Sequence, residues 1–287
     1  MRDFTEWNLT DAALQRLANT PDPRLKHIMS SLIRHLHDFV REVELTEQEW
    51  FQGIKFLTET GHMCDDVRQE FILLSDTLGV SMLVDAINHR SPGRATETTV
   101  IGPFYRDGAP ERGLGESIAG DTPGEPTFVS GRVTDLDGKP IAGALLDVWQ
   151  AAPNGLYETQ DPDQPDFNLR GRFRTDAEGR YAFRTVKPAS YPIPVDGPVG
   201  KMMTALGRQP YRPAHIHLII TAKGYEPLTT HVFVAGDPYL DSDPVFVVKS
   251  SLVVDFVRHD SAGEAMARKT TVPFYTVEYD FALNPAA

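Results

Sequence analysis

Two histidines separated by a single residue form the first pattern in this sequence with clear chemical potential. They are His215 and His217, in the segment RPAHIH at residues 212–217. Side chains at positions i and i+2 of a β-strand point to the same face, so a strand here would bring both imidazoles near one metal ion. Histidine is the commonest metal ligand, but a His-X-His pair is also typical of a partly exposed strand. The pair alone leaves both interpretations open.

Two tyrosines that precede this pair offer oxygen ligands for the same ion. The only cysteine is Cys64, in the part of the chain expected to be helical, which argues against a thiolate zinc site. Tyr157 and Tyr191 lie in turns rich in proline and glycine. A phenolate is a hard anionic donor that suits a trivalent ion such as Fe(III). On composition alone, either tyrosine would equally pack its ring on the core and hydrogen-bond its hydroxyl.

Six short motifs follow one another along the chain. They are LDVWQ at 146–150, the turn around Tyr157, NLRGR at 168–172, TD at 175–176, SYP at 190–192 and RPAHIH at 212–217. Together they resemble the intradiol ring-cleavage dioxygenases, and most closely the hydroxyquinol and chlorocatechol branch of that family, over about residues 14–281. The resemblance implies a non-haem Fe(III) ion bound by Tyr157, Tyr191, His215 and His217.

The resemblance also implies a substrate site beside the metal. Arg212 is the implied active-site arginine, which would stabilise negative charge on the substrate. Tyr191 is the second implied catalytic residue, because it leaves the metal when substrate binds. Asp85 is expected to accept a hydrogen bond from a third substrate hydroxyl, with a plain surface carboxylate as the alternative. His231 stands where simple catechol dioxygenases carry glutamine, and its role stays open. The remaining implied substrate-binding residues are Ile101, Gly102, Pro103, Phe104, Ile193, Pro194 and Val245.

The reaction follows from what such a site offers and what it lacks. No glycine-rich nucleotide fingerprint follows any predicted strand, so the electrons that reduce O2 must come from the organic substrate. A vicinal aromatic diol is such a donor. We expect hydroxyquinol to be opened between two hydroxylated carbons, with both atoms of O2 retained, to give 3-hydroxy-cis,cis-muconate and its tautomer maleylacetate. Catechol and chlorocatechols are the alternative substrates.

Composition and charge narrow the class of protein. The 287 residues, 41% of them hydrophobic, are enough for one large domain or two small ones. A net charge of -12 argues against a nucleic-acid partner. No apolar run approaches about 18 residues, which argues against membrane insertion. The charged first residues and the single cysteine favour a cytoplasmic protein.

The first hundred residues have the apolar spacing of amphipathic helices. One helix follows Pro21-Asp22-Pro23, and Thr46 with Glu49 forms a capping box for the next. Two more are predicted at about 65–78 and 80–88. The first stripe comprises Leu25, Ile28, Met29, Leu32, Ile33, Leu36, Phe39 and Val40. Such stripes need a partner surface, and a second copy of the chain is the expected one. The resemblance implies a homodimer formed through these helices around a bound phospholipid.

Short strands and turns replace the helices from about residue 127 onward. Strands are predicted at 128–134, 144–149, 172–175, 180–185, 215–221, 228–234, 246–254 and 275–281, with a hairpin turn at 176–179. This spacing indicates an antiparallel sandwich rather than alternating β-α-β units. The predicted class is α+β, with a helical dimerisation domain and linker at 1–98 and a β-sandwich catalytic domain with the Fe(III) site at 99–287.

A non-enzymatic β-sandwich of transthyretin-like type is the alternative from a different class. The chain shares the start of such modules in DLDGKPIAGA at residues 135–144. These modules lack turn tyrosines matched to a His-X-His strand. Colour separates the two hypotheses, because charge transfer from tyrosinate to Fe(III) would make the purified protein red, whereas a binding module would be colourless.

Overall fold

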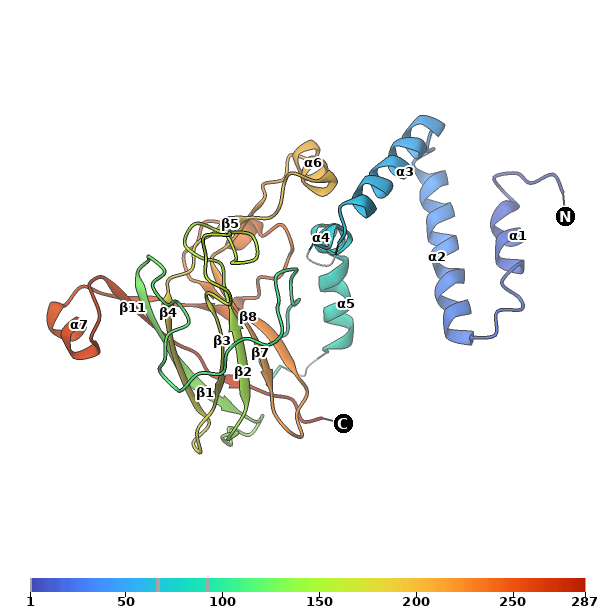
Figure 1. The fold of residues 1–287 in the computed structure, drawn as a ribbon. Coiled ribbons are helices and arrows are strands. Elements are labelled where there is room, and N and C mark those ends of the chain that lie inside the picture. Colours follow the sequence, from blue (N-terminus) through green and yellow to red (C-terminus); the bar gives the residue numbers. More distant parts are fainter. Residues whose placement is uncertain (1, 66–67, 91–92, 287) are drawn as a thin grey trace. The chain divides into compact units, whose positions relative to one another are not determined.

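The structure is a computed structural model that describes residues 2–65, 68–90 and 93–286 (Figure 1). The chain divides into two compact units, Met1–His62 and Met63–Ala287. The first unit contains α1 (Leu9–Gln15), α2 (Pro23–Glu42) and α3 (Glu47–His62), and the second begins with α4 (Glu70–Thr77) and α5 (Val80–Asn88). Part of the helix predicted at 65–78 lies outside the described residues, and the observed helix begins at Glu70. None of the described helices has the length and apolar character needed to cross a membrane.

The starts of the two long helices follow the signals in the sequence. Asp22 accepts a hydrogen bond from the Arg24 backbone N–H, and Pro23 occupies the first turn of α2, where its missing N–H costs nothing. At α3, the Thr46 N–H donates to Glu49 Oε2 at 3.0 Å, and the Glu49 N–H donates to Thr46 Oγ1 at 3.3 Å. This reciprocal pair is the predicted capping box, which is confirmed.

The apolar stripes of α2 and α3 are largely exposed to solvent. Many of their large side chains are between 44% and 63% exposed, including Leu25, Ile28, Leu32, Leu36, Phe39, Trp50, Phe51 and Ile54. The second unit carries a similar set on α4 and α5, in which Leu83 is 62% exposed. Apolar surfaces of this kind mark interaction sites.

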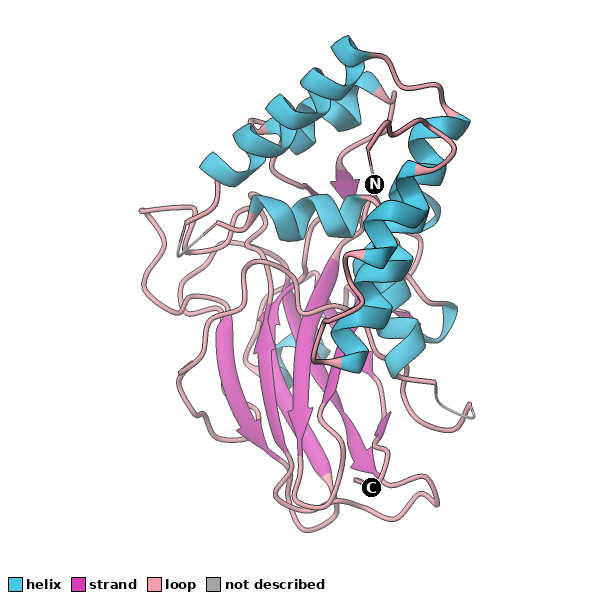
Figure 2. Ribbon diagram, turned by 90° about the vertical axis from the view of Figure 1, so that its right-hand side faces the viewer, coloured by secondary structure: helices cyan, strands magenta, loops and turns pink. Residues whose placement is uncertain are grey.

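Two five-stranded sheets form the body of the second unit (Figure 2). One has the order β10-β11-β1-β12 with β4 also paired to β1, the other has the order β3-β2-β7-β8-β9, and β5 pairs separately with β6. The strands are β1 Pro126–Thr134, β2 Leu145–Trp149, β3 Arg170–Arg174, β4 Arg180–Val186, β5 Tyr191–Pro192, β6 Tyr211–Arg212, β7 His215–Thr221, β8 Leu228–Val234, β9 Val253–Val254, β10 Val257–His259, β11 Phe274–Glu278 and β12 Phe281–Ala282. Helices α6 (Pro198–Ala205) and α7 (Ala262–Arg268) lie between strands in the chain.

Alternation along β7 separates the core of the sandwich from the functional face. Ile216, Leu218 and Ile220 pack into the core between the sheets, so His215 and His217 project from the opposite face of the strand. The same core takes in side chains of both sheets, including Val129, Val133, Phe183 and Val277 from one and Leu146, Val148, Phe173 and Val232 from the other. The predicted helical region followed by a β-sandwich is therefore confirmed, although the sheets are mixed, since β1–β11, β1–β12 and β8–β9 pair in parallel.

The predicted hairpin at 176–179 is wrong, although the turn itself is present. The Gly179 N–H donates to the Asp176 carbonyl at 3.1 Å, and Gly179 has a φ of 70°, the left-handed conformation that favours glycine. However, β3 pairs with β2 and β4 pairs with β1, so the turn carries the chain from one sheet to the other. Alternating polarity defines the buried face of each strand but does not select its partner.

The predicted strand at 246–254 is also wrong over most of its length. Only Val253–Val254 is a strand, preceded by a short 3-10 turn at Ser250–Leu252. Phe246 has a φ of 60°, which a strand does not allow. The backbone here curls around Asp243, whose carboxylate accepts hydrogen bonds from the N–H groups of residues 245 and 247. A buried carboxylate therefore replaces a neighbouring strand as the hydrogen-bond partner.

Candidate metal centre and active site

Four side chains singled out from the sequence converge on the outer face of the second sheet. His215 and His217 come from β7, Tyr157 from the loop after β2, and Tyr191 from β5. Tyr157 Oη lies 3.1 Å from Tyr191 Oη and 3.1 Å from His217 Nε2. His215 Nε2 lies 3.1 Å from His217 Nε2 and 3.4 Å from Tyr191 Oη. The two phenol oxygens and two ring nitrogens thus form a closed ring of potential ligand atoms.

The imidazole of His215 is held in the tautomer that a metal ligand requires. Its Nδ1 lies 2.6 Å from the Pro213 carbonyl oxygen. A carbonyl only accepts hydrogen bonds, so Nδ1 carries the proton and Nε2 presents its lone pair to the other three donor atoms. Burial lowers the pKa of both His215 and His217 well below the usual value, which keeps the two rings neutral.

Two aromatic rings and a glycine pack against the residues that carry the four donor atoms. Trp149 stacks on His217 with ring centroids 4.7 Å apart, and Phe104 stacks on Tyr157 with centroids 4.5 Å apart. Gly102 has a φ of 75°, and a Cβ atom at this position would lie 3.3 Å from His217 Cε1. A side chain there would be strained and would press on the imidazole. The loop before Phe104 therefore needs glycine to pass this close to the centre.

The chemistry of the donor set fits a hard trivalent cation. Burial raises the pKa of Tyr157 well above the usual value, whereas the nearby Arg212 and Arg170 lower it. A bound cation of high charge favours the phenolate form for the same electrostatic reason. Two phenolates and two neutral imidazoles would supply two oxygen and two nitrogen ligands, with two negative charges. Such a set suits Fe(III) better than a soft ion, which prefers thiolates.

Arg212 places a positive charge against the same four atoms. Its Nη1 lies 3.3 Å from His215 Nε2 and 3.5 Å from Tyr191 Oη, and its Nε lies 3.3 Å from Asp243 Oδ1. Its Nη2 has no hydrogen-bond partner among the described residues. Burial acts to lower the pKa of Arg212, but Asp243 and the two tyrosines raise it by more, so the guanidinium is charged. It therefore has a free donor available for a negatively charged substrate atom.

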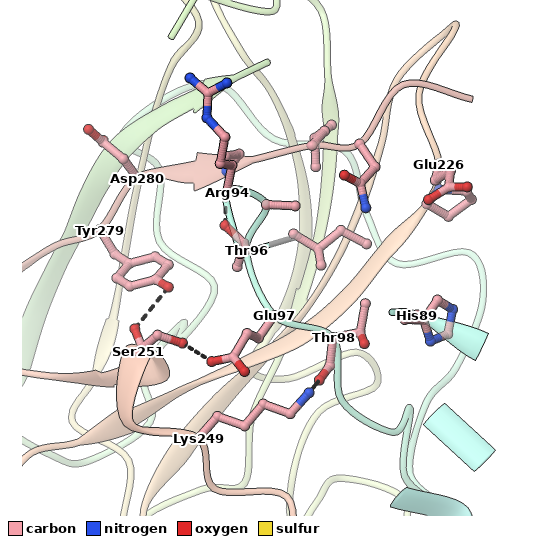
Figure 3. Close-up of a pocket in the computed structure, with 17 residues that line it drawn as sticks. His89, Arg94, Thr96, Glu97, Thr98, Glu226, Lys249, Ser251, Tyr279 and Asp280 are labelled. Carbon is pink, nitrogen blue, oxygen red and sulfur yellow. Dashed lines mark hydrogen bonds between the residues drawn. The ribbon is translucent and has the colours of Figure 1, made fainter. Parts of the chain in front are cut away.

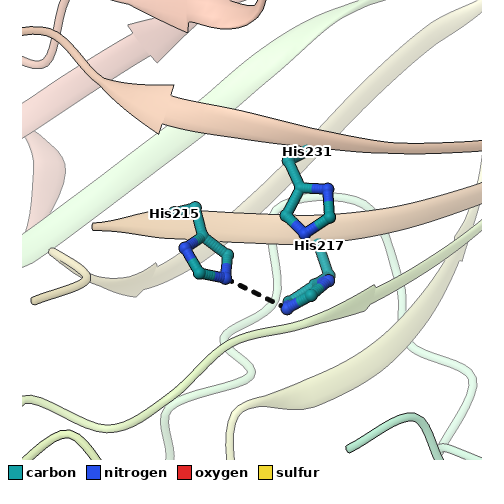
Figure 4. Close-up of side chains that lie close together, drawn as sticks. All are labelled: His215, His217 and His231. Carbon is teal, nitrogen blue, oxygen red and sulfur yellow. Dashed lines mark hydrogen bonds between the residues drawn. The ribbon is translucent and has the colours of Figure 1, made fainter. Parts of the chain in front are cut away.

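His231 is a third imidazole beside the pair, from the neighbouring strand β8 (Figure 4). One ligand atom from each of His215, His217 and His231 lies within 4.8 Å of the others. His231 Nδ1 lies 2.5 Å from Thr99 Oγ1, the only partner that the described residues offer to this buried hydroxyl. The Nε2 atom of His231 has no hydrogen-bond partner among the described residues. His231 therefore lies beside the four donors but outside the closed ring of contacts that joins them.

A cleft of about 490 Å³ adjoins this centre, since its lining includes Leu156 and Pro192, the chain neighbours of Tyr157 and Tyr191. Its wall includes Phe104, which stacks on Tyr157, and Ile193, two residues after Tyr191. Four of the predicted substrate-binding residues line it, namely Pro103, Phe104, Ile193 and Pro194. Val245 lies behind the wall, buried in one apolar cluster with Ile193. Ile101, in contrast, is 43% exposed and does not line the cleft.

Asp85 lies in different surroundings from the other predicted site residues. Its carboxylate is 2.8 Å from His89 Nδ1 and 3.5 Å from Lys249 Nζ, and it accepts a hydrogen bond from Thr98 Oγ1. Thr98, His89 and Lys249 line a second cavity of about 410 Å³, which does not include the four donors (Figure 3). The structure therefore does not bring Asp85 together with the centre.

Asp76 is the carboxylate that the sequence-based reasoning missed. It lies on α4 three residues after Leu73, which lines the cleft, so both side chains share one face of the helix. Burial raises the pKa of Asp76, while a hydrogen bond with Ser81 and the charge of Arg212 act to lower it and Asp243 acts to raise it. The available signal was a carboxylate on the apolar face of the segment FILLSDTLG at 71–79.

The fold and the site together define a β-sandwich protein with a buried cluster of potential metal ligands. Comparison with known proteins makes the class more specific. A family model described as "Dioxygenase" matches residues 100–285, and a model described as "Catechol dioxygenase N terminus" matches residues 22–96. The chain belongs to the family of intradiol ring-cleavage dioxygenases, and it is an oxidoreductase. The transthyretin-like alternative is thereby excluded.

Individual relatives agree with this assignment over nearly the whole chain. A 6-chlorohydroxyquinol 1,2-dioxygenase from Cupriavidus pinatubonensis is 52% identical, covering 99% of each chain. A hydroxyquinol 1,2-dioxygenase from Rhizobium sp. is 51% identical, covering 98% of this chain and 96% of the relative. The solved structure of hydroxyquinol 1,2-dioxygenase from Pseudomonas putida is 56% identical with a TM-score of 0.91, covering 98% of this chain and 99% of that chain.

Proposed function

We propose that this protein is a hydroxyquinol 1,2-dioxygenase, which opens the ring between two hydroxylated carbons and incorporates both atoms of O2. The product is 3-hydroxy-cis,cis-muconate, with maleylacetate as its tautomer. The observation that carries the proposal is the closed ring of two phenol oxygens and two imidazole nitrogens beside a cleft that Phe104 and Ile193 line. The substrate is supported by the names of the relatives that match nearly the whole chain.

The cofactor that we propose is Fe(III), held by Tyr157, Tyr191, His215 and His217. When bound, Fe(III) supplies a Lewis acid that holds two vicinal oxygens of the substrate and enables its electron-rich ring to react with O2. The four residues contribute two oxygen and two nitrogen donors at positions that the fold already fixes. Their burial, with each of them at most 4% exposed, keeps bulk water from the reacting ring.

Tyr191 and Arg212 have the positions that proton transfer and charge stabilisation require. Tyr191 adjoins the cleft wall, since the residues that follow it, Pro192 and Ile193, line the cleft. In its phenolate form, its oxygen can take the proton of a substrate hydroxyl as the substrate enters. Arg212 Nη1 lies within 3.5 Å of the same oxygen, so the guanidinium is placed to stabilise negative charge that develops on the substrate.

Substrate preference provides the test of this function, and Asp76 is the residue that we propose to recognise the third hydroxyl. The wild-type protein is expected to have a higher kcat/KM for hydroxyquinol than for catechol. Asp76→Asn should lower the value for hydroxyquinol by about 10-fold to 100-fold, the size of one hydrogen bond to a charged group. The value for catechol, which lacks this hydroxyl, should change little.

Asp85→Asn on α5 is the matched control, because Asp85 was the acceptor predicted from the sequence. It should leave the ratio of the two kcat/KM values unchanged. A selective loss of hydroxyquinol turnover in Asp85→Asn but not in Asp76→Asn would reverse this assignment. If the wild-type protein prefers catechol or a chlorocatechol, the proposed substrate is wrong.

We further propose that the chain forms a homodimer through its N-terminal helices, around an apolar space suited to phospholipid acyl chains. The support is the exposed apolar stripe of α2, in which Leu32 is 46% and Leu36 is 53% exposed. Burying these side chains removes apolar surface from water, with about 25 cal/mol gained per Å².

Light scattering on the iron-loaded protein at micromolar concentration tests the dimer. The wild-type protein should have twice the mass of one chain. Leu32→Glu combined with Leu36→Glu should shift it toward the monomer, since two carboxylates would be buried in the interface. Arg34→Glu, on the opposite face of α2, should remain dimeric. A wild-type monomer would refute the interface and would leave the metal centre untouched.

A further inference from the structure

One carboxylate outside the centre bridges the two chain segments that carry Tyr191 and His215. Asp237 lies in the turn after β8, next to Gly236, whose φ is 78°. Its Oδ2 accepts a hydrogen bond from Ser190 Oγ at 2.6 Å and another from the Ala214 N–H at 3.0 Å. Ser190 immediately precedes Tyr191, and Ala214 immediately precedes His215. A single oxygen atom therefore contacts the neighbours of one phenol donor and one imidazole donor.

The backbone explains why a side chain is needed at this point. Strands β5 and β6 pair over two residues only, with Tyr191 opposite Arg212 and Pro192 opposite Tyr211. The next residue on the β6 side is Pro213, which has no N–H to extend the ladder. The two segments would separate beyond this pair without another acceptor. The Asp237 carboxylate supplies that acceptor on the side of the ladder where His215 begins.

We propose that Asp237 is a positioning residue for the metal centre, which sets the separation between the Tyr191 phenol and the His215 imidazole. This inference rests on the proposed set of four metal ligands. The distance that Asp237 controls is the 3.4 Å between Tyr191 Oη and His215 Nε2. A carboxylate that accepts two hydrogen bonds holds its partners more strongly than a neutral group, because charge-assisted hydrogen bonds are about twice as strong.

Tyr157 is held by contacts that do not involve Asp237. The proposed role of Asp237 therefore concerns only Tyr191 and His215. The Tyr157 backbone N–H donates to Gln160 Oε1 at 3.1 Å, and the Gln160 N–H donates to the Tyr157 carbonyl at 2.9 Å. Loss of the Asp237 bridge should therefore loosen Tyr191 against His215 while Tyr157 and His217 stay in place. A partly loosened centre is expected to release iron faster rather than to lose it completely.

The experiment compares Ser190→Ala and Asp237→Asn with the wild-type protein, each loaded with Fe(III) as the full chain. Iron retention is measured against a competing chelator, together with the visible tyrosinate-to-Fe(III) band and the thermal unfolding temperature. Both variants should bind iron about 10-fold to 100-fold more weakly, the usual effect of removing a group that orients a metal ligand. The double variant should be no weaker than Asp237→Asn alone, since both changes break the same bridge.

Asp176→Asn is the matched control, because Asp176 also caps a turn through backbone N–H groups, but none of its partners adjoins a ligand residue. It should retain iron like the wild-type protein. If Ser190→Ala and Asp237→Asn both keep wild-type iron affinity and an unchanged band, the positioning role is refuted. If Asp237→Asn does not fold, Ser190→Ala alone tests the positioning role, because it removes only the hydrogen bond between Asp237 and the residue before Tyr191. Failure of the wild-type protein to bind iron would instead refute the ligand set itself.

Discussion

His215→Ala and His217→Ala are each expected to purify with little iron and without the red colour that we expect of the wild-type protein. Both imidazoles are buried and neutral, and each places Nε2 within 3.1 Å of another donor atom of the centre. Alanine supplies no donor, so a metal that needs four protein ligands would lose one of them. Iron content by elemental analysis and absorbance in the visible range should fall together, and ring-opening turnover should be lost with them.

His231→Gln provides the control that makes this result specific. His231 lies as close to the pair as a third ligand would, but it is hydrogen-bonded to Thr99 and stands outside the ring of contacts that joins the four proposed ligands. Glutamine also presents an N–H donor, so this variant should keep its iron and its colour. Retention of a full complement of iron by His215→Ala or His217→Ala would contradict the ligand assignment. Loss of iron from His231→Gln alone would shift the assignment to His231.

The parts of the site that follow from local spacing were predictable from the sequence. His215 and His217 share a face because they are two residues apart in a strand, and the apolar residues between and after them define the buried side. The capping box at Thr46 and Glu49 is local in the same way. In each case the interacting groups lie within one element, so the geometry of that element alone brings them together.

The parts that depend on packing between distant segments were not predictable in this way. Asp76 and Asp85 both lie on predicted helices, and only the tertiary contacts decide which carboxylate lies near Arg212. Asp85 instead contacts His89 and Lys249, and Lys249 is far from it in the sequence. Asp237 reaches Ser190 across 47 residues and Ala214 across 23. The hairpin at 176–179 was wrongly predicted for the same reason. Which strands pair depends on contacts across the whole β-sandwich, and the sequence near the turn does not determine them.

Arg212→Met is expected to abolish most turnover while leaving iron in place, which separates charge stabilisation from metal binding. The guanidinium lies 3.3 Å from His215 Nε2 and has a free Nη2 donor, yet it offers no lone pair to a metal. Removing one donor aimed at developing negative charge typically costs about 100-fold to 1000-fold in rate. We therefore expect kcat/KM for hydroxyquinol to fall by that factor, with iron content and the visible band retained.

Stability has to be measured alongside this variant, because methionine leaves Asp243 buried without its partner. Breaking a buried ion pair on one side costs about 3–5 kcal/mol of unfolding free energy. Arg212→Lys keeps the charge beside Asp243 but lacks the planar fork that contacts His215 and Tyr191 together, so it should recover stability more fully than turnover. If Arg212→Met turns over hydroxyquinol within about tenfold of the wild-type rate, Arg212 does not stabilise the reacting charge. If it loses iron instead, its role lies in holding the ligands, and the loss of turnover would follow from the empty centre.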